Sequence, residues 1–235
     1  MRSFLGWLIL VALLGAVGYV AAPLVVRPLV ADAVRAVSPF GAEPLEVDVD
    51  VDTLRLLRGT IDSVHVSGTN LTSERLVIGR LDATATSVAL GDRSFSSMSG
   101  SLDGVVLRGS DGAEVQAQRV QLSGPSDAVE AVASLSPDAA IAIVRKALDE
   151  AGLSSENLAL VDGGVRMSVL GQTADVALGA ADGAVTIAGS NAGGGTIVVF
   201  GPEPGDPWRI TGISVSPDGI EVNAVVDLGS LLRSR

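Results

Sequence analysis

Residues 45–59 have the sequence LEVDVDVDTLRLLRG. Val47, Val49 and Val51 alternate with three aspartates in it. Alternation with a period of two is typical of a β-strand that has one apolar face and one solvated face. The apolar face either closes a packed core or lines a cavity for an aliphatic ligand. The rest of the sequence helps to distinguish a packed core from a ligand cavity.

Strand patterns continue downstream of this segment. TIDSVHVSG (60–68) and RLVIGRLDATATSVAL (75–90) are rich in β-branched residues. Asp-Gly, a strong signal for a tight hairpin, recurs between apolar stretches at 103–104, 111–112, 162–163, 182–183 and 218–219. These turns predict a mostly antiparallel sheet.

One segment has the pattern of a helix instead. SPDAAIAIVRKALDEAG (136–152) offers Ser136 as N-cap, Pro137 in the first turn and Gly152 as the stop. Ile141, Val144, Leu148 and Ala151 share one stripe of it. The preceding SDAVEAVASL (126–135) is expected to form a shorter helix. With strands on both sides, the sequence predicts a single α+β domain over residues 40–235.

The N-terminal residues 1–26 are expected to be a transmembrane anchor or a signal segment. Residues 4–22 carry no charge, and a longer run to residue 26 would cross the roughly 30 Å hydrocarbon core of a bilayer as a helix. Pro23 follows the small residues where a signal peptidase would cut, which favours an uncleaved anchor. The domain is then tethered to the cell membrane by a single pass and faces the periplasm or cell exterior, or is secreted if the segment is cleaved. Residues 27–39 predict a short amphipathic helix beside the membrane.

Composition excludes several functions. A net charge of −11 and an aromatic content of 3% argue against nucleic acid, which requires basic patches and stacking side chains. His65 is the only histidine and there is no cysteine, so neither a zinc site nor a disulfide framework is expected. No G-x-S-x-G motif accompanies His65. We therefore expect no enzyme and no cofactor.

The order of these features is similar to a known family. Residues 45–90, with LLRG at 56–59, IDSVHVSG at 61–68 and RLDAT at 80–84, resemble the LmeA-like phospholipid-binding family of bacterial envelope proteins. The N-terminal apolar segment and DGIEVNAVVDL at 218–228 match as well, and the rest of the chain matches loosely.

The resemblance implies a fold like that of the tubular lipid-binding proteins, in which a strongly curved antiparallel β-sheet wraps around a helix and leaves an apolar groove. It also implies exported phospholipid binding, with phosphatidylinositol among the lipids, and a role in envelope lipid metabolism. The basic residues of the matched block are candidates for headgroup contacts; these are Arg55, Arg58, Arg75 and Arg80.

Aliphatic side chains suit acyl chains, because a pocket for varied tails needs apolar walls with few polar groups to desolvate. The candidate lipid-binding residues are those of the first strands and of the helix: Val47, Val49, Val51, Leu54, Leu57, Val64, Val66, Ile141, Val144 and Leu148. The expected partners are phospholipid and the membrane. Two alternatives stay open: an envelope scaffold or assembly module with a filled core, in which these residues simply pack, and an enzyme that uses some of the many carboxylates.

Overall fold

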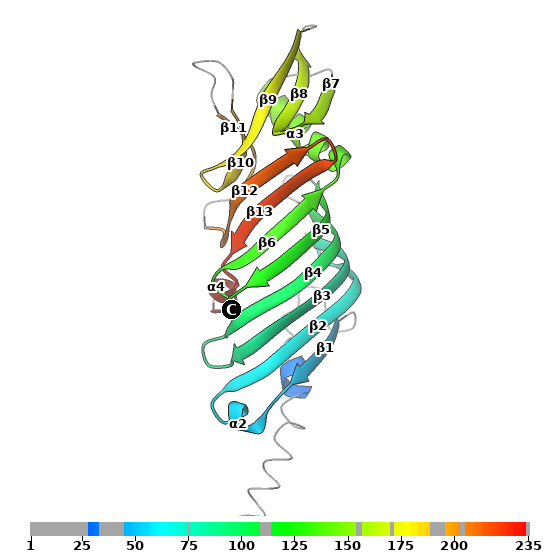
Figure 1. Ribbon diagram of the computed structural model, residues 1–235. Helices are drawn as coiled ribbons and strands as arrows, with labels where there is room; N and C mark the ends of the chain where they lie inside the picture. Colours follow the sequence, from blue (N-terminus) through cyan, green and yellow to red (C-terminus); the bar gives the residue numbers. More distant parts are fainter. Residues whose placement is uncertain are drawn as a thin grey trace, which may run out of the picture.

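The computed structural model is elongated and consists of two antiparallel β-sheets and a few helices (Figure 1). It describes residues 28–32, 45–74, 76–108, 114–153, 157–169, 172–188, 196–202 and 205–233. The α+β class is thus confirmed. Among these residues no helix is both long and apolar enough to cross a membrane, and the expected anchor, residues 1–26, lies outside them.

The larger sheet has eight strands in the order β1-β2-β3-β4-β5-β6-β13-β12. Their bounds are β1 (Leu45–Asp50), β2 (Thr60–Thr72), β3 (Leu76–Ala89), β4 (Ser94–Arg108), β5 (Glu114–Gly124), β6 (Val129–Leu135), β12 (Trp208–Ser216) and β13 (Gly219–Val226). The strands lie side by side along the length of the molecule, with β1 near one end (Figure 1). The predicted strands at 45–52, 60–68 and 75–90 are confirmed, although the first ends at Asp50.

Asp52 ends that first strand because its side chain caps the short helix α2 (Thr53–Leu56). Its carboxylate accepts hydrogen bonds from the backbone N–H of Leu54 at 2.8 Å and of Arg55 at 3.2 Å. An aspartate at this position satisfies backbone donors that have no partner inside the helix. The third aspartate of the alternating stretch is therefore a helix cap rather than part of the strand.

One face of the eight-stranded sheet is apolar. Residues directly opposite each other on neighbouring strands share a face, and one row across five strands is Leu81, Leu102, Val120, Ala133 and Val222. The adjacent row, which points to the other face, is Asp82, Ser101, Gln121, Val132 and Asn223. The alternation of apolar and polar positions seen in β1 thus recurs in these rows from β3 to β13.

The smaller sheet has five strands in the order β11-β10-β9-β8-β7. Their bounds are β7 (Asn157–Val161), β8 (Gly164–Val169), β9 (Gln172–Ala181), β10 (Ala184–Ala188) and β11 (Thr196–Phe200). This sheet and helix α3 (Pro137–Glu150) lie at the opposite end of the molecule from β1 (Figure 1).

The predicted hairpins at 162–163, 182–183 and 218–219 are confirmed. Asp182 (φ 52°) and Gly183 (φ 78°) both have positive φ, as a tight turn of type I′ requires. The hairpin expected at 103–104 is wrong, because both residues lie inside β4, where Asp103 pairs with Arg80 and Arg119. Residues 111–112 lie outside the described residues.

Helix α3 begins as predicted, with the Ser136 hydroxyl 3.3 Å from the backbone N–H of Ala139. Val144 and Leu148 are buried, whereas Ile141 is half-buried and Ala151 is exposed. A helix at 126–135 is wrong, because residues 129–135 form β6, which pairs with β5 on one side and with β13 on the other. Pairing on both sides overrides a weak helical propensity.

The expectation of a strongly curved sheet around a helix is not met. The eight-stranded sheet is twisted but not strongly curled, and α3 lies at its end (Figure 1). The helix contacts β5, β7, β11 and β13, so it buries its apolar stripe at the junction of the two sheets. The sheet therefore needs no curvature around the helix to cover it.

Candidate functional site: an apolar groove

A groove of about 560 Å³ lies on the apolar face of the larger sheet. Its wall residues come from β4, β5, β6, β13 and β12, together with Phe200 and Gly201 at the end of β11. Its volume falls within the range of pockets that bind small molecules, about 300–1,000 Å³. It is larger than a hollow of about 430 Å³ beside β8 and β9.

The floor of the groove is formed by small side chains. Ala131 on β6 lies directly opposite Ala224 on β13, and Ala133 lies opposite Val120 and Val222. A methyl group projects little from a sheet, whereas the surrounding valine, leucine and aromatic side chains stand higher. The alanines therefore leave a hollow where larger residues would have closed a core.

The groove crosses the sheet diagonally. Leu107 and Val115, which pair across β4 and β5, line one end, and Trp208 and Val226, which pair across β12 and β13, line the other. Five neighbouring strands at their usual spacing measure about 19 Å across. One leaflet contributes about 15 Å, half of the hydrocarbon thickness of a bilayer. The groove is therefore long enough for an extended acyl chain.

Arg108 is the only charged residue among the sixteen that line the groove. It lies opposite Glu114 across the β4–β5 pair, and its Nε is 2.9 Å from the Glu114 Oε1. Both side chains are about half exposed, 45% and 46%. The charge thus sits at the rim and is already paired there.

The arrangement suits an aliphatic ligand. Binding sites usually combine an apolar lining with a few placed polar groups, and here the other side chains of the lining are aliphatic or aromatic. Each methylene group that leaves water on this surface contributes about 0.8 kcal/mol. Polar portions of a ligand would find no hydrogen-bonding side chain along the floor, so they would remain outside.

The strand residues predicted to bind lipid lie elsewhere. Val49, Val51 and Val64 are buried in a cluster with Ile61. Val47 and Val66 pack against that cluster, as does Val30 of the helical residues 28–32, the described part of the predicted membrane-side helix.

Two further candidates of that region, Leu54 and Leu57, are 60% and 79% exposed. They lie on and just after α2, far from the groove in the order of strands.

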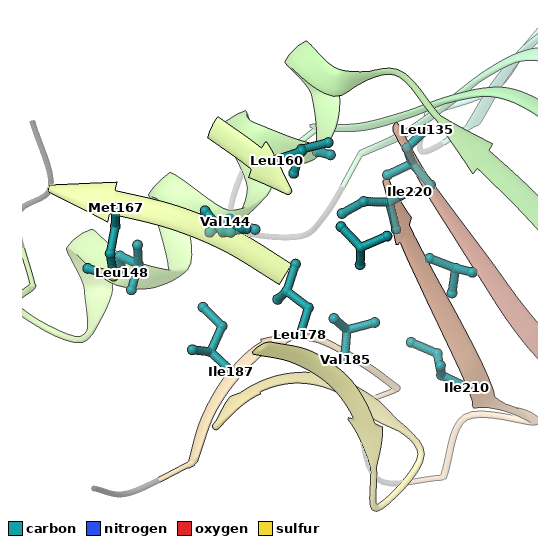
Figure 2. Packing of buried hydrophobic residues seen from close by; sticks show 14 residues of the cluster. Leu135, Val144, Leu148, Leu160, Met167, Leu178, Val185, Ile187, Ile210 and Ile220 are labelled. Carbon is teal, nitrogen blue, oxygen red and sulfur yellow. The ribbon is translucent and has the colours of Figure 1, made fainter. Parts of the chain in front are cut away.

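The helix residues predicted to bind lipid belong to the main core. Val144 and Leu148 lie among Leu178, Val185 and Ile187 of the smaller sheet (Figure 2), and Ile141 packs against the same cluster. The void beside Val144 is only about 10 Å³, which barely admits one water molecule. None of the ten predicted residues lines the groove.

The groove residues were missed because their period-two pattern is interrupted by small or polar residues. Val115, Ala117 and Val120 are separated by glutamines and Arg119, and Ala131 and Ala133 lie in a segment whose sequence predicts a helix. Alternation of small apolar residues on β6 and β13 is the signal that could have identified them.

A second hollow, of about 430 Å³, lies beside β8 and β9 and is lined by Arg166 and Asp175. The two side chains form a bidentate pair, with Nε–Oδ1 at 2.7 Å and Nη2–Oδ2 at 2.8 Å. The hydrogen bond from Arg166 lowers the pKa of the Asp175 carboxyl, and the same bond raises the pKa of the arginine. Arg166 and Asp175 thus satisfy each other, and the third charged residue of this lining, Asp162, lies in the turn between β7 and β8.

His65 of β2 lies beside Thr84 of β3. Its Nδ1 is 3.0 Å from the hydroxyl of Thr84 on the polar face of the sheet. Within the described ranges, no three potential metal-ligating side chains gather at one place.

Comparison with known proteins gives no match: no family model, curated protein or solved structure matches the chain.

Proposed function

We propose that this protein binds phospholipid by laying an acyl chain in the groove on the apolar face of its larger sheet. The observation that carries the proposal is the lining itself, in which one residue of sixteen is charged and four are alanines. In the cell the protein would act as an exported, membrane-tethered carrier or sensor in envelope lipid metabolism. The tether rests on residues 1–26, and the LmeA-like resemblance agrees with the proposal.

A groove-filling variant tests this function. Ala131→Phe places a large ring on the floor, and we expect it to lower uptake of a fluorescent-tailed phosphatidylcholine severalfold. Glu130→Phe is the matched control, because Glu130 is exposed and its side chain projects from the opposite face of β6. The control variant carries the same added ring and retains the apolar residues 1–26, but its groove is open. We therefore expect it to take up lipid like the parent.

Equal uptake by the parent and both variants would mean that lipid binds outside the groove. No uptake by the parent would favour the second candidate, an envelope scaffold with a filled core. That candidate is favoured by the tight packing of Val49 and Val144, which are 3% and 1% exposed.

A further inference from the structure

The charges at the rim of the groove influence which lipid headgroups it can accept. Anionic headgroups are commonly held by unpaired arginine or lysine side chains, or by the N-terminus of a helix. The one cation that lines the groove, Arg108, is held in register opposite Glu114 and bonded to it at 2.9 Å. A phosphate that approached Arg108 would meet a guanidinium whose charge is already balanced by this carboxylate.

The other nearby arginines do not line the groove. Arg119 stands between the groove residues Ala117 and Val120, but it is absent from the lining, and its Nε is 2.7 Å from the Asp103 Oδ1. Arg209 follows the groove residue Trp208 and lies on the opposite face. The described part of the groove thus offers no unpaired arginine or lysine side chain.

The net charge of the whole chain also disfavours anionic headgroups. At −11, the protein repels anions that approach it from solution or from a membrane surface. The resemblance to LmeA-like proteins implies phosphatidylinositol among the lipids, which carries a net negative charge, whereas the rim does not complement such a charge.

From the paired rim we infer that the groove selects a lipid by its aliphatic tail and prefers a headgroup without net charge. This inference rests on the proposed function. The shared chemistry is a long acyl chain attached to an electroneutral polar group, which zwitterionic phosphatidylcholine and uncharged diacylglycerol both provide. Phosphatidylglycerol with the same chains is the anionic comparison.

Uptake of these three lipids by the full-length protein, with identical acyl chains, tests the inference. We expect phosphatidylcholine and diacylglycerol to be taken up similarly and phosphatidylglycerol severalfold less. Raising the salt concentration should narrow the difference, because salt screens repulsion between exposed charges.

Glu114→Gln is the decisive variant. It leaves Arg108 without its carboxylate, so uptake of phosphatidylglycerol should rise severalfold while uptake of the other two lipids stays unchanged. Glu130→Gln removes the same charge from the opposite face of the sheet and should have little effect on any of the three. Preferred uptake of phosphatidylglycerol by the parent would overturn the inference and leave the proposed function standing.

Equal gains in Glu114→Gln and Glu130→Gln would also overturn it, since net charge rather than the rim would then discriminate. Uptake of none of the three lipids by the parent would instead refute the proposed function itself.

Discussion

At the scale of single residues, side-chain size separates core from groove on one continuous apolar face. Val49 and Val64 are directly opposite each other on β1 and β2 and are buried together. Ala131 and Ala224 are likewise directly opposite each other on β6 and β13, yet they form the floor of the open groove. The buried cluster and the groove differ in side-chain size, by a few methyl groups at each position. They also differ in whether residues such as Val30 cover them.

The first prediction concerns Val49. Val49→Phe should lower the free energy of unfolding by about 1 to 3 kcal/mol, because extra volume in a packed cluster forces strain. It should leave lipid uptake by the folded protein unchanged, because Val49 does not line the groove. Chemical denaturation and a tail-uptake assay on the same preparation measure both quantities.

Asp48→Asn is the control for that variant, since Asp48 is exposed on the other face of β1. We expect it to change the unfolding free energy by less than about 0.5 kcal/mol. A Val49→Phe protein that keeps its stability and loses lipid would assign β1 to the binding site after all.

At the scale of elements, the sequence predicts helices and strands well where local and long-range preferences agree. In α3, the cap at Ser136, the proline after it and the apolar stripe all act in the same direction. In β6 they do not, because Ala131 and Ala133 favour a helix locally while β5 and β13 supply hydrogen-bond partners on both sides. Those partners are distant in sequence, so the local pattern could not reveal them.

The groove was unpredictable for the same reason. It joins β4 to β12, and the order of these strands in the sheet is set by pairing between β6 and β13, which are separated by the whole smaller sheet and α3. The apolar character of the proposed ligand could be inferred from the aliphatic composition. The position of its site required the register of the sheet.

The second prediction concerns α3. Val144 is 1% exposed among residues of both sheets, so Val144→Asp buries a charge without a partner and should cost several kcal/mol of unfolding free energy. Arg145→Ala, on the exposed side of the same turn, should stay within about 0.5 kcal/mol. Small and equal effects in thermal and chemical unfolding would contradict the docking of α3 at the junction.

At the scale of the whole molecule, a closed core and an open groove occupy adjoining regions. The smaller sheet and α3 form a closed core with the ends of β6, β12 and β13 (Figure 2). The middle of the larger sheet leaves its apolar face hollow, and its other face carries polar rows. The closed core and the groove adjoin at Leu135, Ile210 and Val222, which belong to the buried cluster and also line the groove.

Trp208 lines one end of the groove, so its fluorescence reports whether an acyl chain lies there. Bromine atoms on an acyl chain quench tryptophan fluorescence at short range, and replacing Trp7, the only other tryptophan, by Phe makes the signal specific. We predict that phosphatidylcholine with brominated tails quenches Trp208 in the Trp7→Phe protein, and that adding Ala131→Phe removes most of the quenching while adding Glu130→Phe does not. Trp208 fluorescence that stays unquenched while the protein takes up the brominated lipid would contradict the assignment of the groove as the acyl-chain site.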